Sequence, residues 1–262
     1  MLRSALIVLS LIATQAPAMA QESTLDRVTT NKTLRVCIWP DYFGISYRDP
    51  KTQQLSGIDI DMANSLGRSL GVKVEFIDSS FAKLIPDVTE NRCDIAMFAI
   101  GLTPSRMEKL RFTKPHLASD IYAITTKSNR RIKSWSDIDK SGVFVAVAKG
   151  TLHEPVMKEK LKQGTLKVFD TPHARELEVE SGRADVFMTD FPYSRRMLKT
   201  TDWARVITPE TNYHITPYGY AMLPGDDRWH ARVESFVAET KRNGELKTSA
   251  ERHGLLPIAR FD

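Results

Sequence analysis

The sequence predicts an α/β protein of two lobes, and two observations support that prediction. Short apolar runs rich in Val, Ile and Phe alternate with stretches of helical periodicity, which is typical of mostly parallel sheets covered by helices. The alternation occurs twice, and the pattern N-R-C-D-I-A-M at residues 91–97 is echoed by G-R-A-D-V-F-M at residues 182–188. Each copy combines a helix end, a turn and a buried strand, so we expect one such unit in each lobe.

The first twenty residues are expected to be removed from the mature protein. Arg3 provides a basic start, residues 5–13 are apolar, and Ala18 and Ala20 precede Gln21, which is typical of a cleaved secretory signal. The apolar run is shorter than the roughly 20 residues that a membrane-spanning helix requires. We therefore expect a soluble, exported protein that begins near Gln21.

The charge and cysteine content narrow the function classes. The formal net charge is +5, and Lys and Arg are spread along the chain without a long basic cluster, so we expect no nucleic-acid partner. The two cysteines, Cys37 and Cys93, both lie in apolar runs. They can pair in an oxidising compartment or remain buried thiols, and the sequence leaves both alternatives open.

Each lobe is expected to contain strands and helices in alternation. In the first lobe we expect strands at residues 34–40, 73–79 and 93–100, with helices at 57–71 and 81–92. In the second lobe we expect strands at residues 143–148, 166–170 and 184–190, with helices at 151–161 and 173–183.

The chain is expected to cross between the lobes twice. Residues 118–127 and 215–224 are rich in strand-forming residues, and the tail contains an amphipathic helix that ends near Asn243 and Gly244.

We therefore predict a first lobe from residues 30–118 and 224–262 and a second lobe from 119–215. The two-strand hinge lies around residues 118–121 and 215–223, and closure of the lobes on a ligand is the natural motion of such a molecule.

Two charged residues are expected to face each other across the cleft between the lobes. Arg106 follows the buried strand of the first lobe, and Asp190 ends the corresponding strand of the second. Ligands of open α/β sheets bind beyond the carboxyl ends of strands. A guanidinium binds a carboxylate and a carboxylate binds an ammonium, so the pair suits an α-amino acid. The alternative is that the two residues pair with each other or with surface groups.

Further candidates lie in the expected loops at the strand ends. Gly150 permits a close turn, and Thr151 with Glu154 forms a T-x-x-E pattern that predicts a capping box and a helix N-terminus able to hold a carboxylate. The alternative is an ordinary helix cap. The aromatic candidates, which could bury the apolar body of a small ligand, are Trp39, Tyr42 and Phe81.

Catalytic and metal-binding motifs are weak in this chain. The sequence lacks G-x-S-x-G, H-E-x-x-H, C-x-x-C, G-x-G-x-x-G and P-loop patterns, and its six histidines are scattered. We expect neither a cofactor nor a metal.

Over nearly the whole mature sequence, the chain resembles the type II periplasmic solute-binding proteins, specifically the polar amino acid-binding branch. The resemblance rests on "DYFGISYRD", "GIDIDMANSLG", "FAKLIPDVTENRCDIAMFAIGLTPSRMEKLRFTKPH", "VAVAKGT", "GRADVFMTD" and "PYGYAML". It implies the type II two-lobed fold, an ABC transporter permease as partner and a monomeric receptor in the periplasm.

The resemblance also implies roles for individual residues. Arg106 would hold the α-carboxylate of the ligand and Asp190 its α-ammonium. Tyr42 and Phe81 would sandwich its side chain, and backbone groups around Gly150 and Thr151 would touch the carboxylate.

Four positions depart from the family pattern. Ala99 and Gly101 stand where small hydroxyl residues are common, so fewer side-chain hydrogen bonds would reach the ligand. Trp39 stands near a position where binders of basic amino acids place an acid, which argues against lysine or arginine as ligand. Lys149 stands where a neutral polar residue is common, and it would favour an acidic side chain if it faces the cleft.

A second resemblance is to exported cyclohexadienyl dehydratases, which share this fold, through "LRVC", "SYRDP", "GIDIDMA" and "CDIA". That family is expected to carry an acidic glutamate shortly after the second-lobe strand, where this chain has Tyr193. We therefore predict a receptor that delivers an amino acid or related small carboxylate to a permease, with the dehydratase as the alternative and a periplasmic sensory role as a third.

Overall fold

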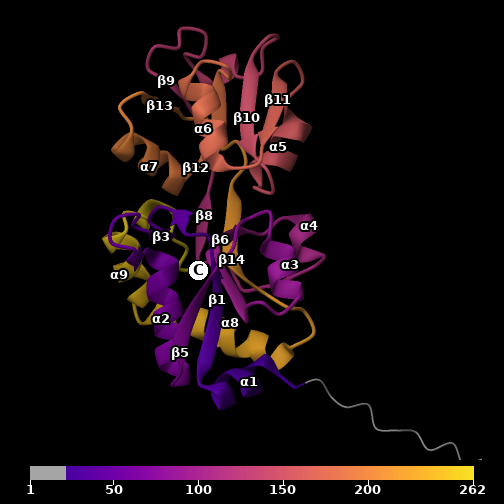
Figure 1. The fold of residues 1–262 in the computed structure, drawn as a ribbon, viewed down its shortest axis with the longest axis vertical. Coiled ribbons are helices and arrows are strands. Elements are labelled where there is room, and N and C mark those ends of the chain that lie inside the picture. Colours follow the sequence, from indigo (N-terminus) through magenta and orange to yellow (C-terminus); the bar gives the residue numbers. More distant parts are fainter. Residues whose placement is uncertain (1–21) are drawn as a thin grey trace, which may run out of the picture.

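The computed structural model describes residues 22–262 and contains two sheets that belong to separate lobes (Figure 1). The expected secretory signal and the cleavage point before Gln21 lie outside the described residues. Within the described chain, no helix has both the length and the apolar character needed to cross a bilayer.

The first sheet has six strands in the order β5-β1-β6-β14-β7, with β8 also paired to β14. Strand β1 runs parallel to β5 and β6, whereas β14 runs antiparallel to β6, β7 and β8. Every residue of β6 is buried, because this apolar strand lies between two others and is covered on both faces. The strands are β1 (Thr33–Ile38), β5 (Lys73–Asp78), β6 (Ile95–Gly101), β7 (Arg111–Phe112), β8 (Leu117–Ser119) and β14 (Thr216–Met222).

Helices and a small three-stranded sheet surround this first sheet (Figure 1). The helices are α1 (Thr24–Asn31), α2 (Ile58–Leu70), α3 (Leu84–Thr89), α4 (Pro104–Met107), α8 (Asp227–Arg242), α9 (Glu245–Arg252) and the 3₁₀ helix η2 (Leu256–Ile258). The small sheet consists of β2 (Asp41–Tyr42), β3 (Ser46–Arg48) and β4 (Leu55–Ser56). The predicted tail helix is α8, which buries Trp229, Val233, Phe236 and Val237 at helical spacing.

The second sheet has five strands in the order β11-β10-β12-β9-β13. Strand β10 runs parallel to β11 and β12, and β9 runs antiparallel to β12 and β13. The strands are β9 (Ile121–Thr126), β10 (Phe144–Ala148), β11 (Thr165–Phe169), β12 (Val186–Asp190) and β13 (Ala204–Ile207). Its helices are η1 (Trp135–Asp137), α5 (His153–Lys160), α6 (Pro172–Glu180) and α7 (Phe191–Thr200).

The two crossings of the chain lie side by side. Ser119 at the end of β8 pairs with Thr216 at the start of β14, so the segment that leaves the first sheet contacts the segment that returns (Figure 1). The chain enters the second sheet at Ile121 and leaves it after Ile207. This pairing gives the two-stranded connection that the sequence predicts.

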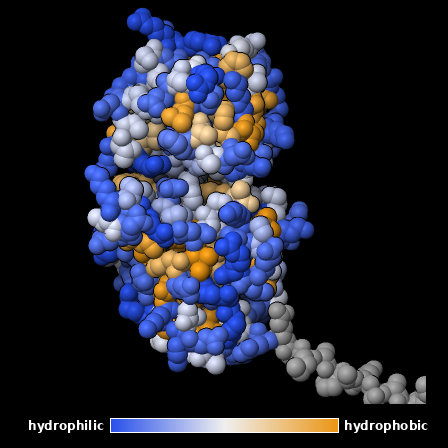
Figure 2. All heavy atoms as spheres, in the orientation of Figure 1, coloured by the Kyte–Doolittle hydropathy of each residue, from blue (hydrophilic) through white to orange (hydrophobic). Residues whose placement is uncertain are grey.

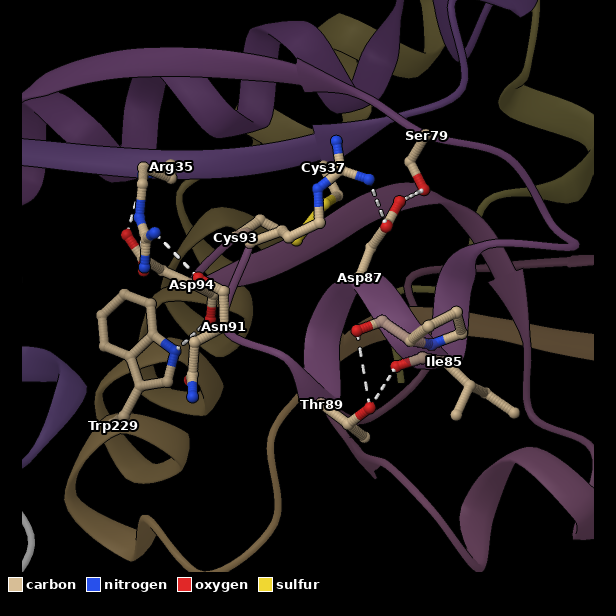
Figure 3. Close-up of a disulfide and its surroundings, with 12 residues drawn as sticks. Arg35, Cys37, Ser79, Ile85, Asp87, Thr89, Asn91, Cys93, Asp94 and Trp229 are labelled. Atoms are coloured by element: carbon tan, nitrogen blue, oxygen red, sulfur yellow. Dashed lines mark hydrogen bonds and ion pairs between the residues drawn. A yellow bond between two sulfur atoms is a disulfide. The ribbon is translucent and has the colours of Figure 1, made fainter.

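The sequence pattern repeated at residues 91–97 and 182–188 leads into strands with equivalent positions in the two sheets. Strand β6 lies between parallel β1 and antiparallel β14, and β12 lies between parallel β10 and antiparallel β9. The aspartate of each copy accepts a hydrogen bond from the backbone of the neighbouring parallel strand, Asp94 from Arg35 N and Asp185 from Phe144 N, both at 2.8 Å. Figure 3 shows Arg35 and Trp229 on either side of Asp94.

The two cysteines are bonded to each other, which resolves the alternative that the sequence leaves open. Cys37 in β1 and Cys93, which precedes β6, form a disulfide with a Cα–Cα distance of 5.6 Å (Figure 3). Both residues are buried in the core of the first lobe. The disulfide therefore fastens β1 to the segment that leads into β6, the strand that precedes Arg106.

Candidate functional site between the two lobes

A cavity lies where the carboxyl ends of β6 and β12 approach each other, and Figure 2 shows the groove that marks this junction on the surface. Its free volume is small, about 20 Å³. Both lobes contribute to its walls. The lining residues are Trp39, Tyr42, Phe81, Ala99, Thr151, Leu152, His153, Pro172, Arg175, Thr189, Asp190 and Tyr193.

Larger hollows lie elsewhere on the first lobe, and each contains charged groups that are already paired with each other. One is lined by Asp61 and Arg252, whose side chains form an ion pair at 2.8 Å. Another is lined by Asp26 and Arg228, which pair at 2.6 Å. The cavity between the lobes differs because it holds buried charged groups without such partners.

Arg106 lies beside this cavity on α4, the short helix that follows β6. Its Nη1 donates to the carbonyl of Gly101 at 3.0 Å, and its Nη2 donates to the carbonyl of Gly150 in the other lobe at 3.0 Å. The residue is 6% exposed, and no carboxylate of residues 22–262 lies within ion-pair distance of its guanidinium. Burial lowers the pKa of Arg106 to about 10, so the group stays protonated at neutral pH.

Asp190 ends β12 and caps α7. Its Oδ1 accepts from Tyr193 N at 3.2 Å, and its Oδ2 accepts from the hydroxyls of Tyr218 at 2.9 Å and of Tyr42. Burial raises the pKa of Asp190, and the two tyrosine hydrogen bonds oppose that rise. Arg106 and Asp190 therefore do not pair with each other. Tyr42 joins the first lobe to the carboxylate of the second.

The predicted aromatic residues form one wall of the cavity. The ring centroid of Trp39 lies 5.0 Å from that of Tyr42 and 5.4 Å from that of Phe81. Tyr193 of the second lobe stacks on Trp39 with centroids 6.0 Å apart and planes 3° from parallel. The wall therefore continues across the lobe junction, and it can bury an apolar ligand body.

Ala99 and Gly101 bring backbone close to the site. Ala99 has a positive φ of 48°, and its N–H donates to the buried carboxylate of Asp59 at 2.7 Å. A Cβ at Gly101 would lie 2.9 Å from Thr216 Cγ2 and 3.2 Å from Leu152 Cδ2. A hydroxyl residue at position 101 would therefore require its neighbours to move, which accounts for the departure at this position.

Gly150 and Thr151 lie where the second lobe touches the first. Gly150 has a φ of +76°, and a Cβ there would lie 2.7 Å from Ala82 Cα.

The predicted capping box at Thr151 and Glu154 is wrong. The Thr151 hydroxyl donates to the carbonyl of Ala148 at 2.7 Å, and α5 begins only at His153. The tight turn after β10 brings that carbonyl within reach, whereas Glu154 accepts from Gly150 N at 3.0 Å.

Lys149 does not face the cavity. Its side chain is 62% exposed, and its ammonium lies 3.7 Å from Asp170 Oδ1 at the surface. The condition under which Lys149 would favour an acidic ligand is therefore not met.

The structure adds a second buried arginine that the sequence analysis does not identify. Arg175, in the first turns of α6, is 2% exposed and lines the cavity. Its Nη1 donates to the carbonyl of Met188 at 3.0 Å, while its Nε and Nη2 have no hydrogen-bond partner within the part of the chain described.

Three neighbours of Arg175 also belong to the site, namely His153, Tyr193 and Glu176. Both ring nitrogens of His153 lack a partner among residues 22–262, and burial is the main cause that lowers its pKa to about 3. The hydroxyl of Tyr193 donates to Glu176 and accepts from Arg196 Nη1 at 2.8 Å. The run T-P-H-A-R-E, which starts a helix after a strand end, is the sequence signal that could have pointed to Arg175 and Glu176.

Known proteins similar to this chain include an enzyme and several binding proteins. The cyclohexadienyl dehydratase of Pseudomonas aeruginosa is 30% identical over 248 residues, which cover 94% of this chain and 91% of that protein. The L-cystine-binding protein TcyJ of Escherichia coli K12 is 23% identical over 235 residues, which cover 90% and 87% of the two chains. The solved structure of the ancestral amino acid-binding protein AncCDT-1, a precursor of cyclohexadienyl dehydratase, has a TM-score of 0.80 and 33% identity, and the match covers 88% of this chain and 99% of that one.

The match to a protein family spans most of the described chain. The bacterial extracellular solute-binding proteins, family 3, match residues 34–255, a range that contains every residue lining the cavity. The predicted two-lobed α/β fold is confirmed by the two sheets and by the structural relatives. This chain therefore belongs to the bacterial extracellular solute-binding proteins of family 3.

Proposed function

We propose that this protein captures an amino acid or a related small carboxylate between its lobes and presents it to the permease of an ABC transporter. The observation that carries the proposal is Arg106, a buried cation at the lobe junction that has no carboxylate partner among the described residues. Burying a charge without a counter-charge costs free energy, and an anionic ligand that pairs with Arg106 would recover part of that cost. Relatives named as binding proteins for cystine and arginine support the transport role.

The ligand would contact both lobes. Its carboxylate would take the place of the Gly150 carbonyl at Arg106, and Asp190 would accept from an ammonium if the ligand carries one. The wall of Trp39, Tyr42 and Phe81 would cover its apolar part. The ligand thereby links the lobes and favours the closed form.

The proposal includes the remaining expectations from the sequence. The first lobe comprises residues 30–118 and 224–262, the second comprises 119–215, and the hinge lies around 118–121 and 215–223. Residues 1–20 direct export to the periplasm, where the protein acts as a monomer without a cofactor.

Thermal unfolding tests this function directly. The purified protein is unfolded and refolded to remove bound solute, and it is then heated with each of a panel of amino acids and organic acids. A true ligand at 100 times its Kd adds about 2.7 kcal/mol of stability, which raises Tm by roughly 5 to 10 °C for a chain of this size. The proposal fails if no carboxylate in the panel raises Tm.

A pair of variants assigns the site. Arg106→Ala is expected to weaken binding by about 2–5 kcal/mol, because it removes a buried charge from one side of an ion pair. Lys149→Ala is the matched control, since this neighbouring cation is exposed and lies off the cavity. Equal affinities in the two variants would show that Arg106 does not hold the ligand.

A second candidate function is the dehydratase, and one observation favours it. The chain has Tyr193 where a glutamate is expected, but Glu176 of α6 reaches the Tyr193 hydroxyl at the cavity. Such a carboxyl group could supply the proton that the leaving hydroxyl of prephenate needs as the bond to its carboxylate breaks, which releases water and carbon dioxide.

The same panel distinguishes this candidate when prephenate is included. Appearance of phenylpyruvate absorbance that Glu176→Gln abolishes would establish an enzyme. A rise in Tm with one amino acid, together with stable prephenate, would establish the receptor.

A further inference from the structure

We propose that the ligand carries a second carboxylate and that Arg175 binds it, so the solute is a dicarboxylate, either an acidic amino acid or a simple dicarboxylic acid. This inference rests on the proposed function and specifies the ligand of the same site. It starts from the two nitrogens of Arg175 that have no partner among the described residues.

The free nitrogens of Arg175 form the donor edge that recognises a carboxylate. Nε and Nη2 lie on one edge of the guanidinium, and together they can donate two parallel hydrogen bonds to the two oxygens of one carboxylate. The third nitrogen, Nη1, is held by the Met188 carbonyl at 3.0 Å. The guanidinium carbon lies 4.2 Å from the centre of the Phe187 ring and 4.9 Å from that of Tyr193. The edge is therefore fixed in place before a ligand arrives.

The acidic residues near Arg175 are committed to other groups. Glu176 accepts from Tyr193 and lies 3.6 Å from Arg196 Nη1 and 3.9 Å from His173 Nδ1. Asp190 accepts from the two tyrosines described above. No carboxylate in the described range 22–262 forms an ion pair with Arg175. Arg175 is therefore, like Arg106, a buried cation without an anionic partner in that range.

A chain of aromatic contacts connects the two arginines. Arg106 is 5.3 Å from the centre of Phe81, Phe81 contacts Trp39, Trp39 stacks on Tyr193, and Tyr193 lies under Arg175. A small diacid placed between the two guanidiniums would offer one carboxylate to each.

The surroundings of Arg175 also favour negative charge. Helices α5 and α6 begin at His153 and Pro172, and both of these residues line the cavity, so two positive helix ends face it. His153 can donate from one of its unpaired ring nitrogens. Asp190 is the only acidic residue among the described residues that line the cavity.

Isosteric pairs test the second carboxylate. Isothermal titration of the refolded protein compares L-glutamate with L-glutamine, L-aspartate with L-asparagine, and succinate with succinamate. We expect the diacid of at least one pair to bind 100-fold or more tightly than its amide, since the amide leaves the donor edge of Arg175 poorly matched. Equal affinities within all three pairs would overturn the inference.

Variants of Arg175 test whether this residue causes the preference for the diacid. Arg175→Met retains much of the side-chain stem but removes the charge, so it should lower affinity for the diacid to that of the amide while affinity for the amide stays within a few-fold. Arg175→Lys should keep part of the preference because it keeps the charge. Arg195→Met is the matched control, because Arg195 also covers an aromatic ring, Phe191 at 4.7 Å, but is exposed.

The Tm of the unliganded Arg175 variant distinguishes a role in binding from a role in stability. Arg175→Met should change the Tm of the unliganded protein only slightly, because the loss of the Met188 hydrogen bond and the ring contacts is offset by the removal of a buried cation that has no ion-pair partner in the described chain. A lower Tm with equal losses for acid and amide would make Arg175 structural and overturn the inference. If monocarboxylates bind through Arg106 and diacids gain nothing, this inference fails alone. If nothing binds, the proposed function fails with it.

Discussion

At the scale of single residues, Asp190 combines several roles. It caps α7, and it accepts hydrogen bonds from Tyr42 of the first lobe and Tyr218 of β14. Burial raises the pKa of both tyrosines, so their hydroxyls remain protonated donors at neutral pH. An ammonium that reaches Asp190 must therefore share a carboxylate that is already hydrogen-bonded.

Asp190→Asn tests whether the ligand uses that carboxylate. The amide oxygen can still cap α7, but it carries no charge, so ligands with an α-ammonium should bind at least about 10-fold more weakly. Acids without an ammonium should keep their affinity. Titration of an amino acid and of its deaminated analogue checks the difference, and equal losses for both would contradict it.

His153 predicts a dependence of stability on pH. Its pKa falls from 6.5 to about 3 in the folded protein, so between these values the unfolded chain binds the proton more tightly. Its contribution to the free energy of unfolding is therefore complete above pH 6.5 and declines as the pH falls. By linkage, the loss between pH 7 and pH 5 amounts to about 2 kcal/mol.

Chemical denaturation at the two pH values measures this contribution. His153→Gln should reduce the difference in unfolding free energy between pH 7 and pH 5 by that amount. An unchanged difference would show that His153 titrates alike in the folded and unfolded states.

The sequence predicts some of these residues and not others. Arg106, Asp190 and the aromatic wall were predicted because strand-end loops meet at one edge of a parallel sheet. Arg175 was missed because a charged residue within a helical pattern usually faces solvent. Only the packing of α6 against β12 and Tyr193 buries it. Lys149 illustrates the reverse, because its loop position did not fix the direction of its side chain.

At the scale of elements, the disulfide joins β1 to the segment before β6, a pairing that the sequence left open. Cys37 and Cys93 are 56 residues apart, and the bond restricts the unfolded chain over that length. Chain-entropy arguments give a contribution of about 4 kcal/mol for a loop of this size.

Replacing both cysteines by alanine should lower the free energy of unfolding by about that amount. Urea unfolding under oxidising conditions measures the change. Reductant should destabilise the natural protein by a similar amount and leave the variant unaffected. Reactive thiols in the natural protein under oxidising conditions would contradict the assignment.

Elements with repeated patterns were the most predictable. Strands β6 and β12, which carry the repeated pattern, have equivalent neighbours. In both, an apolar run follows a turn and an aspartate, and such a run is buried best in the interior of a sheet. The start of α5 was not predictable from T-x-x-E, since the hydroxyl of Thr151 had a closer acceptor in the turn after β10. Local patterns define strands well and define caps poorly where tertiary contacts compete.

At the scale of the whole molecule, Gly150 controls how closely the lobes approach. A Cβ at this position would lie 2.7 Å from Ala82 Cα and 2.8 Å from Ala82 N, which belong to the other lobe. Gly150→Ala should therefore hold the lobes apart and weaken binding by 10-fold or more, because the closed form is disfavoured.

Gly182→Ala is the matched control for Gly150→Ala. Gly182 lies in the same lobe with the same φ of +76°, but a Cβ there meets nothing within 4 Å. Both variants carry the strain of a positive φ, roughly 1–2 kcal/mol, and only Gly150→Ala should keep a larger radius of gyration with ligand in X-ray scattering. Equal compaction of the two variants would refute this role for Gly150.

The position of β14 has a consequence for the order of folding during synthesis. The first sheet requires residues 216–222 between β6 and β7, whereas the second sheet is complete once residue 207 has been made. When the chain emerges from its amino end, the lobe that starts first must therefore wait for the lobe that starts second. The two halves of this protein therefore finish in the reverse of the order in which they emerge.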